Sequence, residues 1–178
     1  MSKTPLILAA LLLAGGPALA AGDHGHAVRA ATKAAPTRTI EIIAGDIYFE
    51  PSRLEVTPGE TVRLIVRNQG NLLHEFRIGT PEQNLAHEAE MAEMVDHGMF
   101  TPTGIDHAMM KSMGHGTMHA IADGSASGVS PLDGIVIEPG QVADLTWTVP
   151  NIPNLEFACT IPGHLAGGMA GPVDLKAR

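Results

Sequence analysis

The sequence predicts an all-β protein, a sandwich of short strands that is interrupted by one partly helical insert. Short runs rich in Ile, Val, Leu and Phe recur along residues 39–78 and 134–175, and turn-forming residues such as Pro58 and Gly59 separate them. Several short strands at this spacing are typical of a β-sandwich. Residues from about 79 to 131 have a different composition, rich in methionine and histidine, and therefore form the insert.

The N-terminal residues have the order of a secretory signal peptide. Lys3 precedes an apolar run at residues 5–14, which is too short to cross a bilayer comfortably, and small residues end at Ala20. We therefore expect residues 1–20 to be a signal peptide that is cleaved after Ala20. The mature protein is expected in the periplasm, with no insertion into the membrane.

The mature chain suits one domain at residues 38–178, after a flexible, alanine-rich leader at residues 21–37. Without Lys3, ten of the eleven Lys and Arg remain against nineteen Asp and Glu, which gives a formal net charge of −9. Such an acidic chain is a poor partner for nucleic acid.

The expected strands are the apolar runs of the two halves. In residues 61–67, arginines and apolar residues partly alternate, which suits a strand with one face in water. The other runs are bounded by turn-forming residues, among them Pro139 and Gly140. The expected strands are residues 39–43, 53–56, 61–66, 74–78, 134–137, 142–149, 155–159 and 171–175.

A helix is expected at the start of the insert. Thr80 is a capping residue, Pro81 suits the first helical position and Gln83 suits the third, which together predict a helix start. The helix is expected to run to about His97 and to end at Gly98.

Three metal-binding side chains are evenly spaced near the C-terminus. The only cysteine, Cys159, is followed at five-residue intervals by His164 and Met169, in a loop between two expected strands. A thiolate, two imidazoles and a weak axial thioether are the ligands of a blue-copper centre. We expect His74, at the start of a strand, to supply the second imidazole, and so predict one type 1 copper. The alternatives to His74 are His87, His97, His107, His115 and His119.

The single cysteine supports this interpretation independently. Exported proteins meet an oxidising compartment, and one cysteine cannot form a disulfide within the chain. An unpaired thiol there risks oxidation unless it is buried or bound to metal. A buried, inert thiol is the alternative interpretation of Cys159.

The insert gathers side chains that suit a second copper store. It holds seven of the eight methionines other than Met1 and five of the nine histidines, with seven acidic residues and one basic residue. Thioethers favour Cu(I), and carboxylates raise the local cation concentration. On the expected helix, His87, Met91 and Met94 fall at positions i, i+4 and i+7 and therefore share one face. A methionine stripe on a helix also packs commonly on a core, so both interpretations stay open there. Residues 107–119, where a second short helix is expected, are denser in both residue types. The candidate Cu(I) ligands are His87, Met91, Met94, His107, Met109, Met110, Met113, His115, Met118 and His119.

The chain resembles the cupredoxins, most closely the exported cupredoxins of bacterial copper tolerance. The resemblance implies a Greek-key β-sandwich with one type 1 copper, and outer-sphere transfer of single electrons through the edge of the loop histidine, here His164. Two features depart from simple electron carriers: the insert, and Glu75 where many have asparagine or serine. The resemblance covers about residues 38–78 and 132–177, and is carried by residues 57–62, 73–76, 138–140, 157–164 and 169–171.

Three functions follow from these observations. The first is a periplasmic copper-binding protein of copper tolerance, with redox cycling at the blue site. The second is a dedicated electron carrier, in which the insert is a lid or a docking surface for a redox partner. An enzyme related to multicopper oxidases or nitrite reductases is disfavoured, because a His-x-His pair occurs only in the leader, at His24 and His26.

Overall fold

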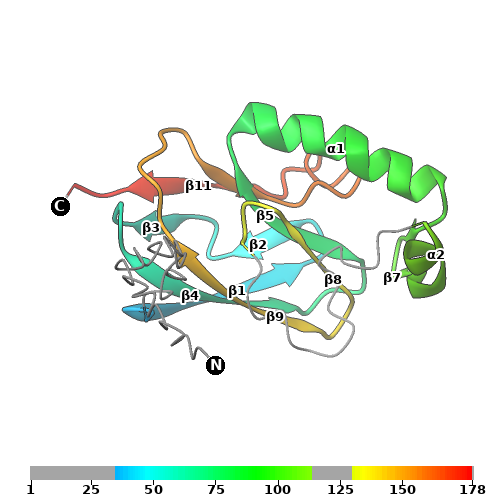
Figure 1. The fold of residues 1–178 in the computed structure, drawn as a ribbon, viewed down its shortest axis with the longest axis horizontal. Coiled ribbons are helices and arrows are strands. Elements are labelled where there is room, and N and C mark those ends of the chain that lie inside the picture. The colour runs from blue at the N-terminus through cyan, green and yellow to red at the C-terminus, as the bar shows by residue number, and fades with distance from the viewer. Residues whose placement is uncertain (1–34, 114–129, 178) are drawn as a thin grey trace, which may run out of the picture. The chain divides into compact units, whose positions relative to one another are not determined.

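The computed structural model describes residues 35–113 and 130–177, which form a β-sandwich with a long helix along one side (Figure 1). The expected signal peptide and most of the leader lie outside the described residues, as do residues 114–129 of the insert. Among the described residues, no helix has the length and apolar character needed to span a bilayer.

The observed strands and helices follow the predicted order closely. Two short features were not predicted: the strand β2 and the hairpin of β6 and β7. The elements are β1 (Arg38–Gly45), β2 (Tyr48–Glu50), β3 (Leu54–Val56), β4 (Thr61–Asn68), β5 (His74–Gly79), α1 (Pro81–Asp96), β6 (Phe100–Thr101), β7 (Gly104–Ile105), α2 (His107–Ser112), β8 (Ile135–Ile137), β9 (Val142–Thr148), β10 (Glu156–Ala158) and β11 (Ala170–Leu175).

Two mixed sheets make the sandwich. One has the order β2-β1-β4-β9 and the other β3-β11-β10-β5-β8. β1 pairs with β4, and β3 with β11, in parallel, whereas the other pairs in these sheets are antiparallel. The all-β sandwich that the sequence predicts is confirmed.

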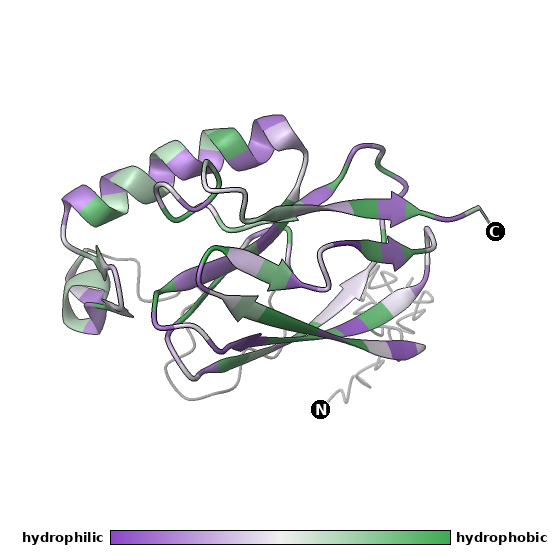
Figure 2. Cartoon of the chain, turned by 180° about the vertical axis from the view of Figure 1, so that it is seen from behind, coloured by the Kyte–Doolittle hydropathy of each residue, from purple (hydrophilic) through white to green (hydrophobic). Residues whose placement is uncertain are grey.

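Aromatic side chains from both sheets meet in the core. Phe49 of β2 packs edge-on against Phe76 of β5 and Phe157 of β10, with ring centroids 5.8 and 5.4 Å apart. The predicted alternation in β4 is also present, since Leu64 is fully buried while Arg63 is exposed and donates to Asp144 (2.9 Å). In Figure 2 the strands carry long hydrophobic stretches, whereas α1 alternates between hydrophilic and hydrophobic residues.

The capping residues set the limits of α1 as predicted. The Thr80 hydroxyl accepts from the Gln83 amide, and the Gln83 side chain accepts from the Thr80 amide. The helix is capped at His97, and Gly98 takes a left-handed φ of +77°, which favours glycine. In the second expected helical region, α2 is a short helix that Asp106 caps at its N-terminus.

Helix α1 lies on the outer face of the five-stranded sheet (Figure 1). Along β5, Phe76 faces the core between the sheets, so its neighbour Glu75 faces the helix. Asn84 of α1 is fully buried and donates to Glu156 of β10 (3.1 Å). The first helix of the insert therefore covers β5, which begins with His74, and β10, which ends directly before Cys159.

Candidate metal centre

Three of the four predicted ligands bring their donor atoms together. His74 is the first residue of β5, Cys159 directly follows β10, and His164 lies in the loop before β11. The Cys159 sulfur lies 3.3 Å from Nδ1 of His164 and 4.0 Å from Nδ1 of His74. One ligand atom from each of these three side chains lies within 4.8 Å of the others. Within the described ranges, no other group of three or more His, Cys, Asp or Glu side chains is placed to hold a metal ion.

Backbone hydrogen bonds close the loop that carries the other ligands. The Cys159 amide donates to the Met169 carbonyl, and the Met169 amide donates to the His164 carbonyl, both over 3.0 Å. Gly163 has a φ of +87°, which allows the turn just before His164. The fourth predicted ligand, Met169, is fully buried and is held beside Cys159 by this pairing.

Burial sets the protonation of the site. His74 and Cys159 are fully buried, and His164 is 9% exposed. Burial raises the pKa of the Cys159 thiol to about 12, and burial also lowers the pKa of both histidines. The imidazoles are therefore neutral at pH 7 with lone pairs free for a metal, whereas the thiol must lose its proton to bind one. A thiol and two imidazoles beside a buried thioether fit copper.

Asp46 lies behind His74, on the side away from Cys159. Its Oδ1 is 3.5 Å from Nε2 of His74, too long for a strong hydrogen bond but close enough to favour the ring orientation in which Nδ1 faces the sulfur. The amides of Asn71 and Leu72 hold this carboxylate (2.8 and 3.1 Å). Nothing in the sequence pointed to Asp46, because it lies in a turn far along the chain from His74.

The Cys159 sulfur accepts a hydrogen bond from the backbone of Glu75, the residue that follows His74. The Glu75 amide donates to the Cys159 sulfur over 3.3 Å. The Glu75 carboxylate accepts from the hydroxyl of Thr160 and contacts Nε2 of His87 at 3.0 Å. His87 also contacts Glu90 through Nδ1 (2.8 Å), and hydrogen bonding to Glu75 raises the pKa of His87.

The methionines of the insert are mostly part of the core. Met91 and Met110 are buried at 0% and 4% exposure, and Met94 and Met109 pack against the same core. Their spacing suited either packing or metal binding, and their surroundings favour packing. Met113 is 47% exposed.

The histidines of the insert differ in their surroundings. Both ring nitrogens of His87 contact carboxylates, whereas His107 is half exposed with Nε2 3.4 Å from Glu138. Additional Cu(I) binding by the insert stays a prediction. The remaining candidates, His115, Met118 and His119, lie outside the described residues.

Sequence comparison places the chain among copper proteins. The cupredoxin-like domain family matches residues 7–101. A copper-resistant cuproprotein CopI of Pseudomonas aeruginosa is 42% identical over 93% of this chain and 91% of its own length. Its namesake from Rubrivivax gelatinosus is 30% identical over 88% of this chain and 80% of its own length.

Solved structures show the same fold. Auracyanin B matches with a TM-score of 0.55 at 19% identity, over 81% of this chain and 92% of its own. The auracyanin of Roseiflexus castenholzii matches with a TM-score of 0.54 at 21% identity, over 80% of this chain and all of its own. Since the domain family covers more than half of the sequence and the relatives match nearly all of it, the chain belongs to the cupredoxin-like family.

Proposed function

We propose that this chain binds copper at a type 1 centre formed by His74, Cys159, His164 and Met169, and that it acts in copper resistance with redox cycling at this centre. The observation that carries the proposal is the convergence of the Cys159 sulfur and one ring nitrogen from each of two buried histidines, all within 4.8 Å of one another. The relatives named copper-resistant cuproproteins support the biological role.

The protein's part in this chemistry is to hold the ligands still and keep water out. Copper would supply one-electron redox chemistry at the site. His74 is fixed by β5 and oriented by Asp46, while backbone bonds within the loop hold Cys159 and His164. Ligands that are held in this way move little between oxidation states, so the rearrangement that slows electron transfer is reduced.

The N-terminal organisation is part of the proposal. We assign residues 1–20 to a signal peptide cleaved after Ala20, residues 21–37 to a leader, and residues 38–178 to the cupredoxin domain, in the periplasm. The beginning of β1 at Arg38 supports the domain boundary. Mass spectrometry of protein purified from the periplasm would test both the cleavage and the location.

A dedicated electron carrier is the second candidate. It is favoured by His164, which is the most exposed of the four ligands at 9% and could pass an electron to a redox partner. In either role we propose a copper-binding protein and not an enzyme. The two roles differ in what the insert binds, because only a copper store needs Cu(I) beyond the single centre.

Copper titration tests the proposal. Mature protein with one equivalent of Cu(II) is expected to turn blue, and Cys159→Ser is expected to abolish the colour. A colourless wild type, or a blue Cys159→Ser variant, would contradict the ligand assignment.

Counting Cu(I) in the Cys159→Ser background tests the insert separately. We expect Cu(I) uptake that falls when five of the candidate ligands are changed to alanine and persists when buried Met91 is changed to leucine. Absence of Cu(I) uptake would favour the electron carrier. These five are His107 and Met113, which are exposed, and His115, Met118 and His119, which lie outside the described residues.

A further inference from the structure

We infer that His87 of α1, acting through Glu75 and Thr160, positions the Cys159 thiolate, so that α1 is a working part of the copper centre. This inference rests on the proposed function. It assigns to His87 a positioning role in place of the Cu(I)-ligand role that its spacing with the methionines suggested.

Glu75 forms two hydrogen bonds with the residues that directly follow β10. Its amide donates to the Cys159 sulfur (3.3 Å), and its carboxylate accepts from the hydroxyl of Thr160, the next residue along the chain. Thr160 is fully buried, so its hydroxyl depends on a partner inside the protein. The two bonds together fix the direction from which the sulfur faces His74.

The Glu75 carboxylate has little freedom to move. Glu75 is 2% exposed, and a carboxylate is expensive to bury unless it is paired. Gly134 has a left-handed φ of +78°, and a Cβ at this position would collide with Oε1 of Glu75. The absent side chain at Gly134, directly before β8, leaves room for the carboxylate.

His87 completes the pairing from the helix. Its Nε2 lies 3.0 Å from Oε1 of Glu75, and its side chain is 11% exposed. The order of contacts is therefore His87, Glu75, Thr160 and Cys159, from the insert to the thiolate. A change at His87 alters how Glu75 is held, and Glu75 carries the amide that bonds to the sulfur.

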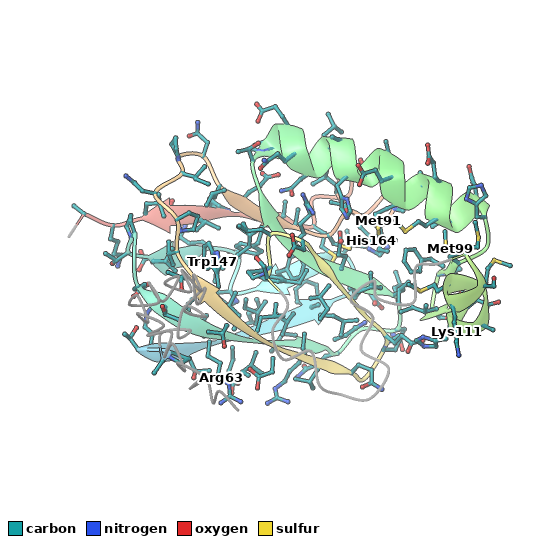
Figure 3. The ribbon with its side chains drawn as sticks, in the orientation of Figure 1. Arg63, Met91, Met99, Lys111, Trp147 and His164 are labelled. Carbon is teal, nitrogen blue, oxygen red and sulfur yellow. The ribbon has the colours of Figure 1, made fainter. Side chains whose placement is uncertain are left out.

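Other contacts hold α1 in the position that this chain of contacts needs. Asn84 donates to Glu156 of β10, and Glu88 accepts from the amide of Gly163 in the ligand loop (3.3 Å). In Figure 3, His164 and Met91 lie on the side of the molecule that α1 covers, and Arg63 lies on the opposite side. The helix thus contacts both the strand before Cys159 and the turn before His164.

The test compares copper-loaded variants of the mature protein. His87→Ala removes the contact with Glu75, and Thr160→Val removes the hydroxyl at nearly constant shape. Leu85→Ala is the matched control, because Leu85 lies on the same helix and is 63% exposed. The measurements are the sulfur-to-copper absorption band, the electron paramagnetic resonance spectrum and the reduction potential, with unfolding of the metal-free protein to verify folding.

We expect His87→Ala and Thr160→Val each to bind copper with a shifted band. Each should change the ratio of Cu(II) to Cu(I) affinity by about tenfold, which is about 59 mV for a one-electron couple. His87→Gln, which restores a donor to Glu75, should return the band toward that of the wild type, and Leu85→Ala should leave it unchanged. The double variant His87→Ala/Thr160→Val should shift the potential by less than the sum of the single shifts.

Folded variants that keep the wild-type band and potential would overturn the inference. Should His87→Ala fail to fold, His87→Leu, which removes the contact with Glu75 but keeps a bulky side chain, decides in the same way. Failure of the proposed function has a different result, because the wild type itself would then lack the band. The two failures are therefore distinguishable in one set of samples.

Discussion

With Cys159 as a ligand, its protonation should make copper binding depend on pH. Burial raises the pKa of this thiol to about 12, so the metal-free protein holds the proton at pH 7. Removing it there costs about 7 kcal/mol, from about five pH units at about 1.4 kcal/mol each. The pKa values of His74 and His164 are lowered, so both rings are already neutral at this pH. Between about pH 7 and 9, Cys159 is thus the one proposed ligand that must release a proton.

The apparent affinity for Cu(I) should therefore rise about tenfold for each pH unit in this range. It can be measured under anaerobic conditions, by competition with a chromophoric chelator whose own Cu(I) affinity is constant over the range. About one proton should be released for each copper bound, as measured with an indicator in weak buffer. Cys159→Ser is the control and should lose both effects. An affinity independent of pH, with no proton release, would refute a protonated, buried thiol that becomes a ligand.

Three further predictions concern side chains around the site and in the core. Asp46→Asn weakens the orientation of His74 and should lower copper affinity about 10- to 100-fold in the same competition assay; unchanged affinity would exclude this role. Phe76→Ala removes a fully buried ring that packs against Phe49 and Phe157. It should lower the free energy of unfolding, measured in urea, by about 3–5 kcal/mol. A loss below about 1 kcal/mol would show that the core is not packed as described. The pKa of His87 is raised in the fold, so its contribution to stability is fully present below the unfolded value of about 6.5 and is lost as pH rises through the folded value. The metal-free wild type should thus exceed His87→Gln in stability by more at about pH 5.5 than at about pH 8.5, and the reverse order would contradict the pairing with Glu75.

Local features of the fold were predictable where the responsible residues are neighbours in the chain. The start of α1 depends on Thr80, Pro81 and Gln83, which act within one turn, and the capping box was expected and is present. β2 was not predicted, because three residues at Tyr48–Glu50 carry too little pattern. Its existence depends on pairing with β1 after a turn in which Ile47 has a positive φ.

The sequence by itself determined the family, the sandwich and the order of the candidate ligands, because each depends on local spacing: apolar runs between turns, and Cys159, His164 and Met169 on one loop. Only the tertiary structure decided which histidine joins them. Six histidines precede this loop in the mature domain, and the pairing of β5 with β10 brings His74 to the sulfur. The tertiary structure likewise decided that Met91 packs in the core and that His87 contacts Glu75. The spacing of side chains along a helix is the same for a face that packs on the core and for a face that binds metal. The two faces differ only in the residues that lie opposite them in the fold.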